Sequence, residues 1–261
     1  MSGVVRVAVT RWPGGASGDD EIVVEEPLEI RVEDHPLAVT MRTPGADLDL
    51  AAGFLWTEGV IDAADDLVGL QHLPGDPVGN TVVARLAGGV EAHWEAIQKA
   101  TREIYATSAC GICGKASLDR IRLLAPTLPR RAQVAPQLLA TLADALRDAQ
   151  PAFARTGGLH GAGLFTLDTG ELELAREDIG RHNAVDKVLG ARLRADRTPV
   201  GDRILVVSGR AGFEIVQKAR MAGVPAVVAI GAASSLAVEL ARDAGMMLAG
   251  FLGRDRYVRY S

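Results

Sequence analysis

The sequence predicts a small α+β unit followed by a larger α/β unit. In residues 3–43 apolar and polar side chains alternate, as they do in strands with one buried face. From residue 182 onward, short apolar segments alternate with helical patterns, which is typical of a largely parallel sheet covered on both faces. The chain has 261 residues, and roughly 150 residues per domain allow one large or two modest domains. We expect a boundary near residue 105, with units over residues 1–105 and 106–261.

The N-terminal unit is predicted to contain several strands and one helix. Asp34-His35-Pro36 separates two alternating segments, so we expect a tight turn between two strands. Gly59 ends an amphipathic segment and is expected to follow the C-terminus of a helix. The expected elements are strands over residues 27–33 and 37–41, a helix over 47–57, and strands near 66–73 and 81–86.

The C-terminal unit is predicted to begin with helices and then to alternate between strands and helices. Asp168-Thr169-Gly170 indicates a turn between two strands. Four leucines are expected on one buried helix face, namely Leu138, Leu139, Leu142 and Leu146. The expected elements are helices over residues 116–124 and 137–149, strands over 163–167 and 171–176, a helix over 182–195, a strand over 203–207, a helix over 213–222, a strand over 226–230, a helix over 235–244 and a strand over 246–252.

The composition excludes several classes of protein. With 48% hydrophobic residues and a net charge of -5, the chain is expected to be folded and not to be a general nucleic-acid binder, which carries a basic field. Two cysteines are too few for a disulfide-rich secreted domain, and the first residues lack the features of a signal peptide. The uncharged segment 221–238 is interrupted by Gly223 and Pro225, which predicts a strand and a loop and not a membrane span. We therefore expect a soluble, cytoplasmic protein.

Both cysteines, Cys110 and Cys113, lie in the glycine-rich segment Thr107-Ser-Ala-Cys-Gly-Ile-Cys-Gly-Lys115. Two buried apolar side chains, a redox-active dithiol and half of a structural zinc site are three interpretations. The fourth is a nucleophile that carries sulfur, because a following helix N-terminus and Lys115 would lower the pKa of the Cys110 thiol. Flanking glycines would let a second cysteine or a cofactor approach the sulfur closely. The fourth interpretation uses every residue of the segment, and we favour it.

The order of His93-Trp94-Glu95 and the two cysteines is also that of a zinc deaminase motif. Ala109 stands where that motif has proline, and the gap between its two halves is short for a helix, a strand and two turns. We therefore expect neither a deaminase centre nor a structural metal.

Several loops of the C-terminal unit are suited to bind an anion. Residues 208–212 and 231–235 each follow an apolar strand and open a helix, with Ser234 or Ser235 as the N-cap. Within residues 178–183, Arg181 and His182 would suit a phosphate or a guanine edge. Ordinary turns are the alternative for the first two loops, and a helix-capping segment is the alternative for the third.

Two further groups of residues are candidates for the same site. His160 lies in a run of glycines and is either a hydrogen-bonded loop histidine or a neighbour of the site. Near the C-terminus, arginines alternate with tyrosines in a pattern typical of a surface that stacks on bases, whereas a solvated edge strand is the alternative. These residues are Arg254, Arg256, Tyr257, Arg259 and Tyr260.

The cysteine segment Ser108-Ala-Cys-Gly-Ile-Cys-Gly-Lys115 closely resembles the cysteine loop of the FdhD family, the sulfurtransferase accessory proteins of formate dehydrogenases. The resemblance extends along most of the chain and is specific because several long strings occur in the same order. These strings are Glu25-Glu-Pro-Leu-Glu-Ile-Arg-Val32, Ala52-Gly-Phe-Leu-Trp-Thr-Glu-Gly59, Thr156-Gly-Gly-Leu-His160, Arg176-Glu-Asp-Ile-Gly-Arg-His-Asn-Ala-Val-Asp-Lys187, Ser208-Gly-Arg210, Phe213-Glu-Ile-Val-Gln-Lys218 and Gly250-Phe-Leu-Gly253.

The resemblance implies a role in molybdenum-cofactor maturation. It implies that Cys110 accepts persulfide sulfur from a cysteine desulfurase and passes it to the bis-molybdopterin guanine dinucleotide cofactor, before that cofactor enters the apo formate dehydrogenase. Cys113 matches the second cysteine of the family loop. A homodimer and a three-layer C-terminal domain similar to the cytidine deaminase fold are also implied. The cofactor contact falls on Phe251, Leu252, Gly253, Arg254, Asp255 and Arg256, where Gly253-Arg254 departs from the expected Arg-Gly order.

Three hypotheses from different classes follow. The leading one is a sulfurtransferase that works through a persulfide on Cys110. The second is a chaperone that binds the cofactor for the apo formate dehydrogenase without sulfur chemistry, in which case both cysteines are dispensable. The third, zinc-dependent hydrolysis, requires stoichiometric zinc in the purified protein.

Overall fold

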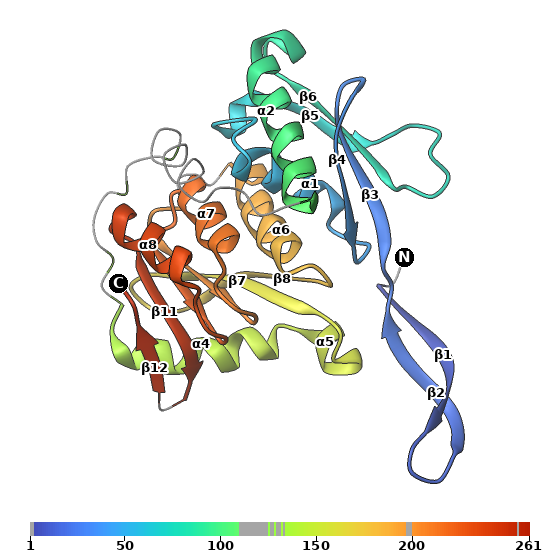
Figure 1. The fold of residues 1–261 in the computed structure, drawn as a ribbon, viewed down its shortest axis with the longest axis vertical. Coiled ribbons are helices and arrows are strands. Elements are labelled where there is room, and N and C mark those ends of the chain that lie inside the picture. Colours follow the sequence, from blue (N-terminus) through green and yellow to red (C-terminus); the bar gives the residue numbers. More distant parts are fainter. Residues whose placement is uncertain are drawn as a thin grey trace.

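The computed structural model describes residues 3–109, 125, 128, 132, 134–196, 200–254 and 256–261. Within these residues the chain forms a two-stranded, a four-stranded and a six-stranded sheet (Figure 1). The predicted helix over 116–124 lies outside the described residues. No helix of the described part is long and apolar enough to cross a membrane.

A two-stranded arm precedes the body of the protein. Strands β1 (Val4–Arg11) and β2 (Ala16–Val23) pair antiparallel, in agreement with the alternating pattern, and project away from the other elements (Figure 1). Two hydrogen bonds of 2.8 and 2.9 Å from Arg155 to Glu21 brace the arm against the body. An isolated hairpin is only marginally stable in water, so this contact helps to hold the arm in place.

The four-stranded sheet has the order β4-β3-β6-β5. A tight turn joins β3 to β4 as predicted, but it consists of residues 33–34 and not 34–36, since His35 and Pro36 already belong to β4. Leu28, Ile30 and Val32 project from one face of β3 into a core that two helices cover. Helix α2 was not among the predicted elements. Few of its described side chains, among them Ile97 and Ala100, are buried, so the apolar face from which a helix could be predicted is narrow. The elements are β3 (Glu26–Val32), β4 (His35–Arg42), α1 (Asp47–Thr57), the short helix η1 (Ala64–Asp66), β5 (Leu67–His72), β6 (Thr81–Leu86) and α2 (Gly89–Ala109).

The six-stranded sheet has the order β12-β11-β10-β9-β7-β8. The predicted strands are confirmed, but only β9, β10 and β11 run parallel to one another. The other pairs are antiparallel, because a tight turn joins β7 to β8 and a short return joins β11 to β12. The strands are β7 (His160–Thr166), β8 (Leu172–Asp178), β9 (Arg203–Val207), β10 (Ala226–Ala229), β11 (Met247–Gly253) and β12 (Arg256–Arg259).

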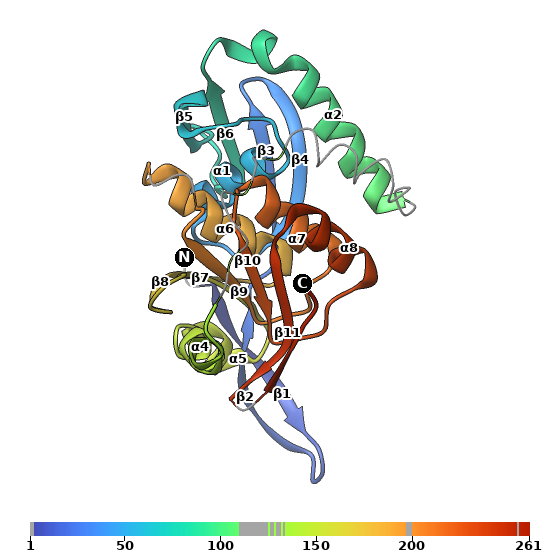
Figure 2. The same ribbon diagram turned by 90° about the vertical axis from the view of Figure 1, so that its left-hand side faces the viewer.

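Helices cover both faces of this sheet, which confirms a three-layer α/β unit (Figure 2). One face carries α6 (Arg181–Arg194), α7 (Phe213–Met221) and α8 (Ser235–Ala244), and the other carries α4 (Pro136–Asp148) and α5 (Pro151–Thr156). The sheet separates two apolar cores, one on each face. Side chains along β9 alternate between them: Leu205 and Val207 pack in the core on the α6 side, and Ile204 and Val206 pack in the core on the α4 side. Of the four leucines predicted to be buried in α4, three are fully buried and Leu138 is partly so.

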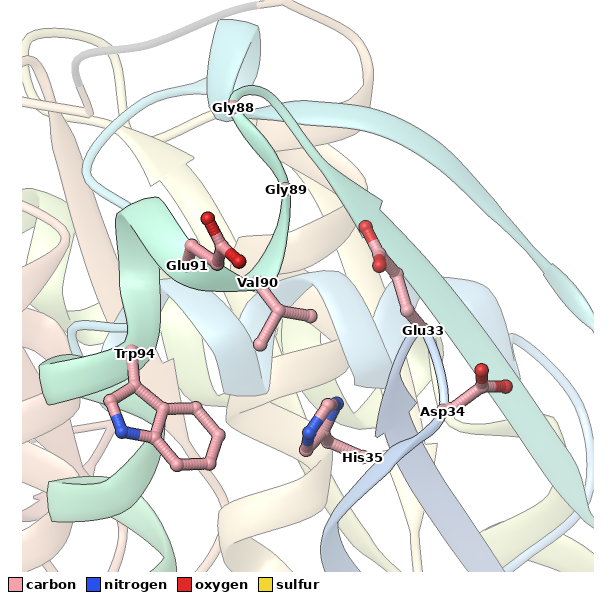
Figure 3. A pocket seen from close by; sticks show the side chains of 8 residues that line it. All are labelled: Glu33, Asp34, His35, Gly88, Gly89, Val90, Glu91 and Trp94. Atoms are coloured by element: carbon pink, nitrogen blue, oxygen red, sulfur yellow. The ribbon is translucent and has the colours of Figure 1, made fainter.

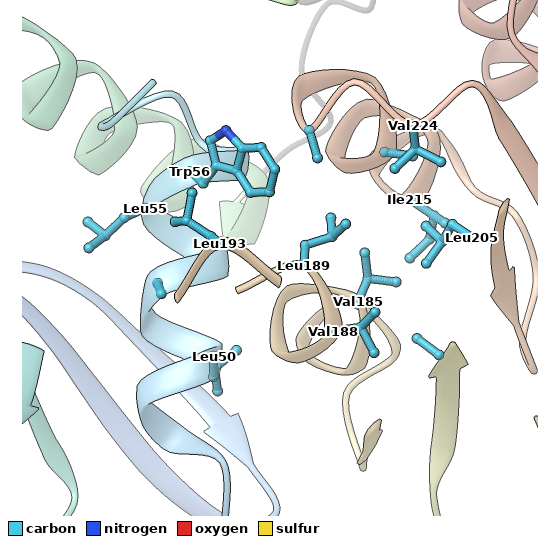
Figure 4. Close-up of a cluster of buried hydrophobic side chains, with 14 of the residues drawn as sticks. Leu50, Leu55, Trp56, Val185, Val188, Leu189, Leu193, Leu205, Ile215 and Val224 are labelled. Atoms are coloured by element: carbon cyan, nitrogen blue, oxygen red, sulfur yellow. The ribbon is translucent and has the colours of Figure 1, made fainter. Parts of the chain in front are cut away.

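Helices α1 and α6 join the N-terminal elements to the six-stranded sheet. A Cβ atom added at Gly53 would lie 1.9 Å from the carbonyl oxygen of Asp186, and one added at Gly190 would lie 1.9 Å from that of Asp49. The two backbones therefore touch where these glycines face the other helix. Around this crossing, Trp56 of α1 and Leu189 of α6 belong to one continuous apolar cluster (Figure 4). The boundary near residue 105 stays a prediction.

Buried charges reinforce the joint between α1 and α7. Lys218 lies 2.9 Å from a carboxylate oxygen of Glu58 and 2.9 Å from one of Asp186. The hydroxyl of Thr57 donates to Asp186 over 2.8 Å and accepts from Lys218 over 3.0 Å. Burial opposes the charge of Lys218, but the two carboxylates dominate and raise its pKa. The ammonium group therefore stays charged inside the protein and ties three helices together.

We predict that Gly190→Ala destabilises the protein by about 1–3 kcal/mol or more, because the new methyl group forces the two helix backbones apart. Urea denaturation measures this loss. Gly253→Ala is the matched control, since the nearest atom to its added Cβ is 3.8 Å away and belongs to a flexible side chain. Equal stability of the two variants would contradict the close crossing.

Candidate functional site

One edge of the six-stranded sheet gathers the loops that the sequence analysis selected. Parallel pairing places the ends of β9 and β10 at the same edge. Antiparallel pairing brings the start of β7 and the end of β8 there too, since His160 pairs with Asp178 and Ala162 with Val207. We call this the carboxyl edge. Residues 178–183, 208–212 and 231–235 thus share it, although they are far apart in the sequence.

Three helices begin at the carboxyl edge. Gly180, Gly212 and Ser234 are the N-caps of α6, α7 and α8. The predicted capping role of Ser234 is confirmed, because its hydroxyl accepts from the N–H of Ala237 over 3.3 Å. The first turn of a helix has N–H groups without intrahelical partners and a positive dipole end. Three such ends at one edge create an environment that favours a phosphate or another anion.

Glycines pack the loops of the carboxyl edge closely. The N–H of Gly231 donates to the carbonyl of Gly209 over 2.9 Å, and a Cβ on Gly231 would lie 2.8 Å from that oxygen. A Cβ on Gly250 of β11 would lie 2.9 Å from the carbonyl oxygen of Gly231. The N–H of Phe251 donates to the same carbonyl over 2.9 Å. Three strand ends are thereby in backbone contact, which leaves little room for side chains between them.

Cationic and titratable side chains surround these glycines. Arg181 and Arg210 are exposed. His182 Nε2 lies 2.7 Å from Glu214, and this contact is the main reason that the pKa of Glu214 is lowered. His160 lies next to Gly209, and a Cβ on that glycine would be 3.4 Å from its Nδ1. Burial lowers the pKa of His160, and the positive charge of Arg181 lowers it further. The sequence carries no local signal for the pairing of His182 with Glu214, which lies on another helix.

Residues 178–183 divide into a buried and an exposed part. The Asp178 carboxylate is fully buried and accepts from the N–H groups of Thr43 and Gly180, from Asn183 and from Lys187, whose Nζ is 2.6 Å away. Neither Asp178 nor Asn183 is the N-cap of α6, which is Gly180 without a side-chain cap, but the hydrogen bonds of Asp178 and Asn183 hold the start of α6 in place. Arg181 and His182 are the members of the segment that stay available for a ligand.

The segment predicted to contact the cofactor lies at the end of β11. Phe251 is 47% exposed, and its backbone is tied to the carboxyl edge, whereas the side chain of Leu252 is buried in the core that faces α4. Arg254 is exposed and forms an ion pair of 2.8 Å with Asp144. Gly253 ends β11, Arg256 begins β12 at the edge of the sheet, and Asp255 lies outside the described residues. For the arginines and tyrosines near the C-terminus, a solvated edge strand was the alternative to a surface that stacks on bases. The structure has an edge strand there, namely β12.

Cys110, Cys113 and Lys115 lie outside the described residues, so their predicted roles stay predictions. The last described residue before them is Ala109, where α2 ends. In the same helix, the two ring nitrogens of His93 each lie 3.0 Å from a backbone carbonyl oxygen, that of Val60 and that of Ala87. His93 therefore attaches α2 to its neighbours, which is a structural role.

Comparison with known proteins gives consistent matches along the chain. The profile of the FdhD/NarQ family matches residues 23–261. The sulfur carrier protein FdhD of Streptomyces avermitilis is 51% identical over 243 residues, which span 89% of this chain and 84% of that protein. The sulfur carrier protein FdhD of Nocardia farcinica is 49% identical over 268 residues, which span 100% of this chain and 95% of that protein.

Among solved structures, a formate dehydrogenase accessory protein from Desulfotalea psychrophila aligns with a TM-score of 0.75 and 23% identity, over 99% of this chain and 96% of that one. The two proteins share their fold. A guanine deaminase from Nitrosomonas europaea covers 57% of this chain with a TM-score of 0.37, a value too low to support an argument.

We predict that the pKa of His160 measured by NMR titration lies below its ordinary value of 6.5. Arg181→Gln should raise it part of the way back, because the charge of Arg181 is removed while burial and the neighbouring His182 still lower the pKa. Arg210→Gln is the control and should leave it unchanged. Since the folded state favours the neutral ring, the stability that His160 contributes is present above the ordinary pKa and is lost as the pH falls through the lowered one. An unshifted pKa in the parent protein would contradict this arrangement.

We also predict that Lys187→Met destabilises the protein by about 3–5 kcal/mol, because the buried carboxylate of Asp178 loses its counter-charge. The double variant Asp178→Asn/Lys187→Met should recover part of this loss. Urea denaturation of both variants provides the measurement. A single variant that is as stable as the double variant would show that the charge pair is not the cause.

Proposed function

This chain belongs to the FdhD/NarQ family, and we propose from this premise that it is a sulfur carrier and sulfurtransferase in the maturation of formate dehydrogenase. The observation that carries the proposal is the segment Cys110-Gly-Ile-Cys113, which holds both cysteines of a chain about half identical to proteins named sulfur carriers. The proposed donor is a cysteine desulfurase, and the proposed acceptor is bis-molybdopterin guanine dinucleotide. We further propose that the protein works in the cytoplasm as a homodimer.

The donor step is a thiolate exchange. The thiolate of Cys110 attacks the outer sulfur of the persulfide on the desulfurase, a new S–S bond forms, and the desulfurase cysteine leaves as a thiolate. The product is a persulfide on Cys110, and no external oxidant or reductant is needed. We assign Cys113 a supporting role, in which it hydrogen-bonds to the persulfide. Its thiolate can also attack the Cys110 sulfur of the persulfide, which releases hydrosulfide and leaves a Cys110–Cys113 disulfide that takes the segment out of use until a thiol reduces it.

The acceptor half of the proposal rests on the carboxyl edge. The proposed acceptor is an anionic dinucleotide, which the protein binds as a substrate and not as a resident cofactor. The N-termini of α6, α7 and α8 offer free N–H groups to its phosphates, while Arg181 and His182 offer charge-assisted hydrogen bonds. Gly231 lets its loop pack against the carbonyl of Gly209, which holds the two loops together at this edge. In this proposal the neighbouring residues 251–256 add further contacts.

A chaperone that binds the cofactor without carrying sulfur is the second candidate. The carboxyl edge supports the chaperone as well as the sulfur carrier, because both candidates must bind the anionic cofactor and the geometry of this edge concerns only that binding. The two candidates differ in the cysteines, which the chaperone does not need.

The decisive experiment is intact-protein mass spectrometry after incubation with a cysteine desulfurase and cysteine. We predict a gain of one sulfur atom that a reductant removes, and no gain in Cys110→Ala. Cys113→Ala is the matched control and should still gain sulfur, because the carrier is the first cysteine of the segment.

Absence of the gain in the parent protein, with a desulfurase that loads another acceptor, would reject the sulfur carrier and support the chaperone. A gain that persists in Cys110→Ala but disappears in Cys113→Ala would move the carrier role to the second cysteine.

A further inference from the structure

A surface pocket of about 640 Å³ lies on the N-terminal unit, between the turn that joins β3 to β4 and the start of α2. Figure 3 shows Glu33 of the turn, His35 at the start of β4, and Glu91 and Trp94 of the helix around one space, whereas the carboxylate of Asp34 points away from Trp94. Gly88 and Gly89 both have positive φ values, of 77° and 72°, and reverse the chain between β6 and α2. The pocket thus forms between segments that are far apart in the sequence.

The pocket carries a strong negative charge. Glu33, Asp34 and Glu91 each present a carboxylate, and none of the three has a side-chain ion pair or hydrogen bond within the described part of the chain. The carboxylates of other acidic residues, such as Glu29 beside Arg31, are paired. The unpaired carboxylates of the pocket are therefore suited to a positively charged ligand.

The aromatic part of the pocket adds a second kind of contact. Glu91 and Trp94 are three residues apart on α2, so the carboxylate and the indole lie on the same face of the helix. Trp94 is 43% exposed, and its ring makes an edge contact with His35 at a centroid distance of 5.4 Å and an interplanar angle of 76°. An exposed indole beside a carboxylate attracts a cation through the ring face and through an ion pair at once.

The aromatic wall, and the lack of a compact set of metal ligands among the described residues, indicate the class of cation. In the described residues no three His, Cys, Asp or Glu side chains lie close enough together to hold a metal ion. The carboxylates are instead spread around a wide space with an aromatic wall. A guanidinium group matches this arrangement, because it is planar, is weakly hydrated, stacks on aromatic rings and offers five N–H donors to several carboxylates.

We propose that this pocket binds the guanidinium group of an arginine side chain on a protein partner. A partner protein is the occupant that we favour because all three carboxylates are exposed at the surface, where a basic segment of another chain reaches them. The arginine stacks on Trp94 and forms ion pairs with Glu91 and with Glu33 of the turn. This docking site shares no lining residue with the carboxyl edge.

The test is an NMR titration of the full chain with N-acetyl-arginine amide, followed on the indole N–H signal of Trp94. The signal is assigned with Trp94→Phe, since the chain has three tryptophans. The neutral isostere N-acetyl-citrulline amide and the free polyamine spermidine are titrated in parallel. We expect the arginine probe to move the signal in a salt-dependent manner, and the citrulline probe to leave it in place.

Matched variants on α2 test the contacts. Glu91→Gln should raise the dissociation constant of the arginine probe about two- to fivefold, which is the range expected for one exposed ion pair. Glu95→Gln removes the same charge from an exposed residue of the same helix that does not line the pocket, and it should leave the constant unchanged. Equal shifts with arginine and citrulline, equal constants for the two variants, or binding of spermidine without binding of the arginine probe would each overturn the proposal.

Discussion

The close crossing of α1 and α6 is the constraint on which the rest of the structure depends. Gly53 and Gly190 let the two helix backbones touch, and a methyl group at either position would overlap a carbonyl oxygen of the other helix. Apolar side chains on both sides of the crossing then form one continuous cluster that reaches from the four-stranded sheet to β9 (Figure 4). Because cores are packed as densely as organic crystals, this crossing sets the position of each sheet relative to the other.

Buried charge pairs extend this joint to the carboxyl edge. Asp178 accepts from the N–H of Thr43, which follows β4, and pairs with Lys187 of α6. Lys187 in turn donates to the carbonyl of Thr43 over 2.8 Å. The first turn of α6, which carries Arg181 and His182, is therefore anchored to the N-terminal elements as well as to its own sheet. An anchored helix end holds ligand-binding side chains with less loss of conformational entropy on binding.

The sequence segments that carry the family resemblance contain two kinds of residues: buried ones that hold the helices together and exposed ones that can contact a ligand. In Ala52–Gly59, Gly53 forms the helix crossing, while Thr57 and Glu58 hold Lys218. In the string from Arg176 to Lys187, the buried members stabilise the start of α6. The exposed members at the carboxyl edge are few, and they are the ones left for chemistry. The acidic pocket between the β3–β4 turn and α2 is a separate surface, because none of its lining residues belongs to the loops of the carboxyl edge.

The sequence by itself determined the order of most elements, although α2 and α5 were not among those predicted, because period-two and helical patterns are local and turn residues mark their ends. It predicted the helix over 47–57 with its observed bounds and nearly all the strands of the six-stranded sheet. It also singled out Cys110 and Cys113, whose placement lies beyond the described residues. Only the tertiary structure decided the helix crossing, the assembly of the carboxyl edge, the structural role of Asp178 and the acidic pocket. The reason is that these features join residues far apart in the chain, such as Thr43 and Lys187 with a separation of 144 positions, and no local pattern encodes such contacts.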